Sequence, residues 1–286
     1  MTSWCLRIGA ALLLLVVPLA GQEQQLSRAQ PPNVSPWQPT RLSDGQPDVQ
    51  GIWGAVLGGV FSLTNPMTGG DDFAQRLGGP RIRNPSRIVD PPDGRVPYQP
   101  WAAALQERQS SAWEHAMRPE EIDTQSRCLL SIAPRLAMLP SPFQIIQAPA
   151  SVVFVWDDYH AYRVVRLDGS PHVGPGVKLW MGDARGHWEG TTLVIDTTNM
   201  NGKGRLSVVG DFLSEHAHVT ERLTFVDRDT MNYEVTIDDP TVFTRPWTMR
   251  AAEKRKPDYE FWESACHEGE KSAEHMLLTN QNGSQP

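Results

Sequence analysis

The second half of the chain is built from short apolar segments separated by turn residues, and this pattern limits the fold more than any other feature. Each segment is rich in β-branched and aromatic residues, with Gly, Asp and Asn between segments. Short strands at such spacing predict a meander that closes into a barrel or a sandwich. We expect a mainly β protein with an antiparallel β-barrel. The predicted strands are residues 143–148, 151–156, 161–167, 177–181, 191–197, 218–226, 231–237, 245–252 and 259–266.

The rest of the chain is interpreted from its composition. Among 286 residues, 24 prolines and 23 glycines favour long loops over a helical bundle. The segment "PWAAALQERQSSAWEHAM" predicts one peripheral helix, because proline suits a first turn and good helix formers follow it. The expected organisation is a signal peptide at 1–22, a flexible linker at 23–47, one barrel domain at 48–275 with a Pro/Gly-rich excursion at 64–100 and a helix near 100–117, and a disordered tail at 276–286.

The N-terminus has the layout of a secretory signal peptide. Arg7 precedes an apolar run from Ile8 to Val17, and small residues follow at Ala20 and Gly21. We expect the mature protein to be periplasmic or secreted. We also expect no stable membrane insertion after signal removal, since no later segment approaches the ~20 consecutive apolar residues of a membrane span.

Two cysteines remain once Cys5 leaves with the signal peptide. In an exported chain, Cys128 and Cys266 are more often joined in a disulfide than free. On the chain-entropy model, a bridge closing so long a loop stabilises the fold by about 4–5 kcal/mol. A catalytic thiol is the weaker alternative, because an exposed thiol is readily oxidised in an oxidising compartment.

Charge and missing motifs exclude several functional classes. The formal net charge is −7 and the pI is about 5.6, whereas nucleic acids and anionic membranes bind basic surfaces. The motifs of P-loops, zinc proteases and serine hydrolases are not found in the sequence. We therefore predict no cofactor and a small molecule as the ligand or substrate, and we leave the oligomeric state open.

The segment "WDDYHAYRVVRLDG" places acids, a histidine and arginines in a predicted β-hairpin. Strict alternation along the returning strand puts His160 and Arg163 on opposite faces. Both side chains reach one cavity only if the strand begins with a bulge. The two residues are therefore either part of a site or polar groups at the end of a hairpin.

A carboxylate on an apolar strand face is the clearest chemical signal in the sequence. Glu221 shares its face with Val219 and Leu223, whereas His218 lies on the opposite face. Such a carboxylate must be paired or protonated. Glu263 has the same placement in the predicted strand 259–266, and inward carboxylates suit acid/base chemistry. The alternatives are a structural pair with a buried arginine, or a barrel whose apolar side faces outward.

Several motifs occur in a defined order. They are "IVDPPDGRVPYQPWA", "RCL", "FQIIQAP", "YHAYRVVRLDG", "WMGDARGHWEGTTLVIDTTN", "HVTERL", "DDPTVFTRPWT" and "ACHEG". Across roughly residues 88–275 they resemble a widespread family of exported bacterial proteins. The early "PDVQGIW" is similar to the Gly-x-Trp start of lipocalin-like barrels, so the resemblance implies an exported lipocalin-like (calycin-like) barrel. His187 stands where members of the family typically carry arginine, and we exclude it as a catalyst.

Three functional hypotheses follow, of which the last is a structural protein of the cell envelope. The first is an exported enzyme, a lyase, isomerase or hydrolase, in which a histidine and a carboxylate transfer a proton while an arginine contacts an oxyanion or a carboxylate. The second is a non-catalytic lipocalin-like binding protein for a small apolar or aromatic ligand. The expected catalytic residues are His160, Arg163, His218 and Glu221. The expected substrate-binding residues are Tyr159, Asp183, Arg185, Trp188, Arg222, Trp247, Glu263 and His267. No metal site is predicted, although His160, His218 and His267 are the imidazoles we considered for one.

Overall fold

The computed structural model describes residues 37–56, 59–64, 85–112, 115–262, 264 and 266–283. The predicted signal peptide, the linker up to residue 36 and most of the Pro/Gly-rich excursion lie outside these residues. Among the described residues, none of the helices has the length and apolar character needed to cross a membrane.

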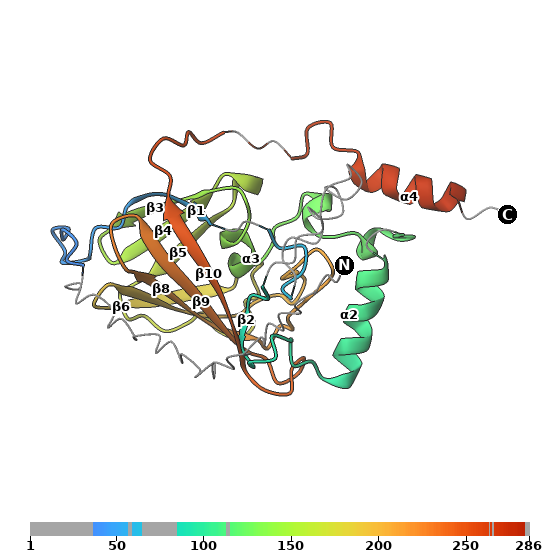
Figure 1. The fold of residues 1–286 in the computed structure, drawn as a ribbon, viewed down its shortest axis with the longest axis horizontal. Coiled ribbons are helices and arrows are strands. Elements are labelled where there is room, and N and C mark those ends of the chain that lie inside the picture. The colour runs from blue at the N-terminus through green and yellow to red at the C-terminus, as the bar shows by residue number, and fades with distance from the viewer. Residues whose placement is uncertain are drawn as a thin grey trace, which may run out of the picture. The chain divides into compact units, whose positions relative to one another are not determined.

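The described strands form a closed, nine-stranded barrel with one extra strand, which confirms the mainly β prediction. The barrel order is β1-β3-β4-β5-β6-β7-β8-β9-β10, and pairing of β10 with β1 closes it, while β2 is added beside β10 (Figure 1). The strands are β1 (Gly51–Ala55), β2 (Ile88–Asp90), β3 (Phe143–Ala148), β4 (Ser151–Trp156), β5 (Tyr162–Arg166), β6 (Asp183–Glu189), β7 (Thr192–Thr198), β8 (His218–Phe225), β9 (Thr230–Asp238) and β10 (Trp247–Arg255).

One strand pair departs from the predicted antiparallel barrel. β5 and β6 run parallel, and they pair only at Val165 with Ala184 and at Arg166 with Arg185. Two neighbouring parallel strands need a connection that carries the chain back along the barrel to the end where the first strand began. Residues 167–182 form this connection. The predicted strand 177–181 falls in this connection, where Leu179 makes only an isolated bridge to Met200.

Strand β6 is not among the strands predicted from the sequence, because the glycines at 182, 186 and 190 are typical of turns. Gly190 does have a positive φ of 63° in the turn after β6. Gly186, however, lies inside the strand. A Cβ atom on Gly186 would lie 2.8 Å from Val165 Cγ1 and 3.0 Å from the Val194 carbonyl oxygen, so glycine permits the close approach of three strands.

The core fills the barrel interior with the inward side chains of the alternating strands. Trp53 and Trp247 are fully buried, and the Trp53 ring lies 5.3 Å from that of Phe225 in an edge-to-face arrangement. Burial alternates strictly along β8 and almost as strictly along β9 and β10. The sequence analysis placed Val219, Glu221 and Leu223 on one face of β8. The structure buries this face, which confirms the predicted inside and outside of the barrel.

The described helices are α2 (Pro100–Ala112), the short α3 (Ala133–Ala137) and α4 (Ser272–Gly283). α2 agrees with the predicted peripheral helix, while α3 is entirely buried at one end of the barrel (Figure 1). Two expectations of disorder differ from the structure. Trp37, in the predicted linker, packs against the core, and the predicted tail is helical to Gly283.

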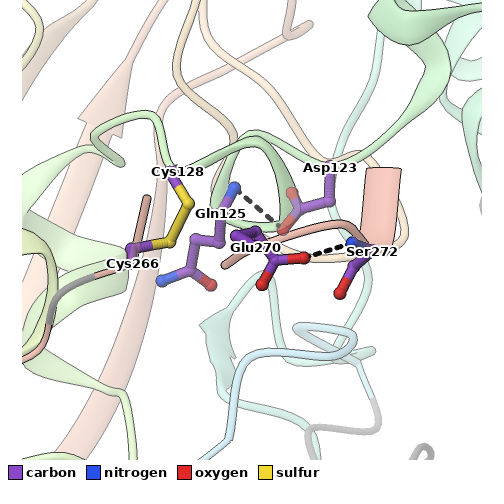
Figure 2. The surroundings of a disulfide bond; sticks show 6 residues. All are labelled: Asp123, Gln125, Cys128, Cys266, Glu270 and Ser272. Atoms are coloured by element: carbon purple, nitrogen blue, oxygen red, sulfur yellow. Dashed lines mark hydrogen bonds between the residues drawn. A yellow bond between two sulfur atoms is a disulfide. The ribbon is translucent and has the colours of Figure 1, made fainter. Parts of the chain in front are cut away.

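The predicted disulfide is present: Cys128 and Cys266 are bonded, with their Cα atoms 5.7 Å apart (Figure 2). It joins the turn after η2 (Gln125–Arg127) to the C-terminal segment. Beneath this turn, Asp123 accepts a hydrogen bond from the Gln125 backbone and forms an ion pair at 2.7 Å with the fully buried Arg135. The bridge therefore attaches the C-terminal segment to a rigid part of the fold.

The segment that carries Cys266 is not the strand expected from "YEFWESAC". Residues 259–262 have no regular secondary structure, and Glu263 lies outside the described residues. The barrel already ends with β10, because β10 pairs with β9 along one edge and with β2 and β1 along the other, which leaves no edge for a further strand there. A hydrogen bond from the Tyr259 hydroxyl to Asp157 instead fixes the start of this segment on the barrel.

We expect reduction of the disulfide to release the C-terminal segment while the barrel stays folded. Cys266 follows the last barrel strand, so a reduced chain can free residues beyond Arg255 without opening the barrel. The melting temperature should fall by only a few degrees, well below what the full chain-entropy value of about 4–5 kcal/mol implies. Trypsin digestion with and without reductant, read by mass spectrometry, should show new cleavage at Lys271 only after reduction. A fall of more than about 10 °C would show that the bridge stabilises the barrel itself.

Candidate functional site

A pocket of about 540 Å³ opens where β5 and β6 diverge. Its walls come from two segments, 159–166 and 179–185, with Leu130 at one side. The pocket lies where the β5–β6 ladder has ended, because only Val165 and Arg166 of β5 pair with β6. Four predicted site residues line it: Tyr159, Arg163, Asp183 and Arg185.

Arg163 connects this pocket to a polar cluster inside the barrel. Its Nη2 donates to Glu221 Oε2 and to Thr197 Oγ1, each at 2.5 Å. The Tyr233 hydroxyl donates to the other carboxylate oxygen of Glu221, also at 2.5 Å. Glu221 is only 2% exposed, and both of its oxygens have partners. The sequence requirement that Glu221 be paired or protonated is therefore met by a buried ion pair with Arg163.

The Arg163–Glu221 pair is positioned by strand register. Both side chains occupy inward positions of their strands, β5 and β8, and β7 between them contributes Thr197 from the same face. Burial and the neighbouring Glu221 carboxylate raise the pKa of Tyr233 well above 10, so its phenol stays protonated as the hydrogen-bond donor.

Part of the Arg163 guanidinium has no acceptor, because both hydrogen bonds of the side chain come from Nη2. Its Nε is buried and makes no hydrogen bond to any described residue, and only 4% of the side chain is exposed. Buried donors are nearly always satisfied, and a buried guanidinium N–H beside a pocket is a natural contact for a ligand.

Tyr159 lines the pocket from a strained position. It has φ 62° and ψ 15°, a left-handed conformation that non-glycine residues adopt rarely, within the 3₁₀ turn η3 (Asp158–His160). Partial burial, together with the nearby Asp158 carboxylate, raises the pKa of Tyr159 to about 12. The Tyr159 phenol therefore stays neutral at physiological pH, and its hydroxyl makes no hydrogen bond to another described residue.

A second polar network lies on the outer side of the pocket wall. Asp183 pairs with Arg185 at 3.0 Å and with His172 Nδ1 at 3.0 Å. His172 Nε2 lies 3.4 Å from Asp196 Oδ1, and the same oxygen lies 2.7 Å from His218 Nε2. The chain of contacts therefore runs from the pocket wall to His218, whose side chain is half-exposed on the outer face.

The structure thus brings some predicted catalytic residues together and separates others. Arg163 and Glu221 are in contact inside the barrel, whereas His218 projects from the other face of the same strand as Glu221, as alternation predicted. The side chain of His160 lies outside what the structure describes.

The remaining predicted binding residues are dispersed. Trp188 donates through Nε1 to Gln46 Oε1, away from the pocket lining, and Arg222 forms an exposed ion pair with Glu189. Trp247 is fully buried in the core, and His267 is exposed beside the disulfide. None of these four lines the pocket between β5 and β6.

Several residues of the site were missed in the sequence. Tyr233 and Thr197 could have been found by the test that selected Glu221, because each is a polar residue on an apolar strand face. His172 gave no signal, since it lies in an aperiodic loop. Asp196 occupies an ordinary outward strand position, and only the observed packing joins it to the histidines.

The comparisons with known proteins add no relative. No family model, no curated protein and no solved structure matches this chain. The resemblance to a family of exported proteins therefore stays a prediction, and the site must be interpreted from its own geometry. Within the residues described, no group of three or more His, Cys, Asp or Glu side chains is arranged to hold a metal ion.

A second pocket, of about 440 Å³, lies at another part of the barrel beside Trp37 and Arg255. It contains none of the residues predicted for the site, and one of its two arginines, Arg255, is already engaged with the Trp53 ring at 4.5 Å. We therefore place the candidate site at the pocket between β5 and β6.

Proposed function

We propose that this protein is an exported barrel that binds a small, partly apolar molecule in the pocket between β5 and β6. The observation that carries the proposal is the pocket itself, in which a buried arginine with an unfilled donor meets apolar and aromatic walls. Ligand sites typically have volumes of about 300–1,000 Å³, mostly apolar linings and a few polar groups that orient the ligand. The barrel, with its lipocalin-like opening sequence, fits the same function.

Two features support export to the periplasm or beyond the cell. The N-terminal sequence has the three parts of a signal peptide. The disulfide between Cys128 and Cys266 is of the kind that forms and persists in oxidising compartments.

The enzyme hypothesis is the second candidate, and one contact favours it. Asp183 lines the pocket and contacts His172, so a carboxylate and an imidazole lie together at the pocket wall. Such a pair can transfer a proton, with Asp196 and the half-exposed His218 completing a path to solvent. Glu221 is less suited to this task than expected, because Arg163 and Tyr233 occupy both of its oxygens.

The binding proposal is tested by filling the pocket. Val164 lines the pocket and Val226 does not, and their exposures are nearly equal, 45% and 43%. Tryptophan at each position makes a matched pair: Val164→Trp should fill the pocket, while Val226→Trp should only add apolar surface elsewhere. We expect naphthyl and phenylalkyl acids, amides and alcohols to bind the natural protein and the Val226→Trp variant by calorimetry. Binding to Val164→Trp should be at least about ten-fold weaker, the equivalent of 1.4 kcal/mol.

Mass spectrometry of the recovered compounds distinguishes the two candidate functions. Unchanged compounds support a binding protein, whereas a product that forms with the natural protein but not with His172→Gln supports the enzyme. If no compound binds, or if the two tryptophan variants bind equally well, the pocket is not the site and the proposal is wrong.

A further inference from the structure

We infer that the pocket between β5 and β6 selects ligands that carry a carboxylate, bound by Arg163 with help from Arg166 and Arg185, and this rests on the proposed binding function. The chemical class follows from the charges at the pocket and from the donors left open there. These charges and donors all belong to residues that the structure describes.

One of the arginines at the pocket forms no ion pair with any described carboxylate. Three arginines line the pocket, at positions 163, 166 and 185, together with one carboxylate, Asp183. Glu221 pairs with Arg163 from inside the barrel, and Asp183 pairs with Arg185 at the wall. The side chain of Arg166 forms no hydrogen bond or ion pair with any described residue. The exposed carboxylate of Asp168, which is outside the pocket lining, attracts it electrostatically but leaves its guanidinium donors open at the pocket mouth. A site with this excess favours a ligand with one negative charge.

The open donors agree with an anionic group. Arg163 uses Nη2 for both of its hydrogen bonds, and its buried Nε has no acceptor. A ligand oxygen at this point would satisfy a donor that otherwise stays unpaired in a desolvated place. The nearby Tyr159 hydroxyl adds a second free donor, and it remains protonated because its pKa is raised to about 12. Donors without matching acceptors suit a carboxylate, which accepts hydrogen bonds and donates none.

The rest of the lining defines the ligand's other end. Trp180 and Met181, from the segment 179–185, and Leu130 at one side supply apolar and aromatic surface. The volume of about 540 Å³ accommodates a ring system with a short acidic side chain. The inferred ligand is therefore an apolar or aromatic carboxylic acid.

The test compares one acid with its own amide. We choose 2-naphthylacetate and 2-naphthylacetamide, which share shape and ring system but differ in charge, and measure both by calorimetry. The natural protein should bind the acid at least about ten-fold more tightly than the amide, a difference of 1.4 kcal/mol. Raising the salt concentration should weaken binding of the acid and leave binding of the amide unchanged.

Two substitutions assign the preference to the arginines. Arg166→Gln removes an unpaired charge at little cost to folding, and it should weaken binding of the acid several-fold without affecting the amide. Arg163→Lys keeps a cation beside Glu221 but removes the planar set of donors, so it should bring the acid-to-amide ratio close to one. Circular dichroism and the melting temperature verify that this variant is folded. Arg250→Gln, which breaks an ion pair with Glu234 on the outer face of β10, is the control and should change nothing.

The possible failures are distinguishable. Equal affinity for the acid and the amide, with both lost in Val164→Trp, would overturn the carboxylate inference and leave the binding function intact. Preference for the acid that survives both arginine substitutions would show that the carboxylate lies elsewhere, which also overturns the inference. Failure of both compounds, and of the wider panel, would remove the binding function itself.

Discussion

Replacing Glu221 with glutamine is expected to lower the melting temperature by roughly 10 °C, because it removes one half of a buried ion pair. Arg163 would remain inside the barrel with its charge uncompensated, and the loss of one partner of such a pair typically costs about 3–5 kcal/mol. Glutamine preserves the size of the side chain, so a cavity does not contribute. Differential scanning calorimetry of the purified variant measures the effect.

The neighbouring residue on the same strand provides the control. Arg222 forms an exposed ion pair with Glu189, so Arg222→Gln should cost less than about 1 kcal/mol. Replacing both partners of the buried pair, with Arg163→Met and Glu221→Leu, should recover much of the stability lost by Glu221→Gln. If Glu221→Gln and Arg222→Gln lower the melting temperature equally, Glu221 is solvated and the interior cluster does not exist in solution.

The second large effect has the opposite sign and concerns Glu253. This glutamate points into the barrel from β10 and is completely buried, and neither of its carboxyl oxygens has a partner among the described residues. Burial raises the pKa of Glu253 well above its ordinary value, and attraction to Arg87 offsets this only in part. Glu253→Met should therefore raise stability, by about 1–4 kcal/mol at neutral pH, since it removes a buried carboxyl group that keeps its proton in the folded protein and releases it on unfolding.

The pH dependence provides a sharper test of Glu253. With the folded-state pKa raised, both states are protonated below about pH 4.5 and the group imposes no penalty. As the pH rises above this value, the unfolded chain loses the proton while the folded protein keeps it, so stability falls by about 1.4 kcal/mol per pH unit until the folded group also ionises. The advantage of Glu253→Gln over the natural protein should thus grow from pH 4 to pH 7 in denaturant titrations.

Glu234→Gln is the matched control for this measurement. Glu234 lies on β9, partly exposed, in an ion pair with Arg250. Its replacement should show no stability gain that grows with pH. An advantage of Glu253→Gln that is constant from pH 4 to pH 7 would mean that Glu253 is ionised in the folded protein, with a partner that the described contacts do not include.

The barrel could be predicted because its strands carry their own signal. The inward face of β8 follows directly from alternation around Glu221, as the burial pattern confirms. β6 was missed because Gly182, Gly186 and Gly190 suggested turns, whereas Gly186 is required for strand packing. The parallel pairing of β5 with β6 could not be foreseen, since it depends on the path of the long connection and not on either strand's sequence.

The site was predicted less completely than the fold, for a physical reason. Alternation assigns a residue to a face but does not identify its partner across the barrel. The contact between Arg163 and Glu221 depends on the register of the strands between them. Similarly, His218 was correctly placed outward, but its neighbour His172 comes from a loop that only tertiary packing brings near.

The seam between β1 and β10 has a consequence for how the protein is made. Trp53 in β1 is opposite Arg255 in β10, so the barrel can close only after the chain has emerged as far as about residue 255. Until then, β1 and β9 present open strand edges, which invite pairing with other chains. Contacts between such distant residues also form slowly. A product cut short before Trp247 cannot close, and aggregation rather than partial binding is its expected fate.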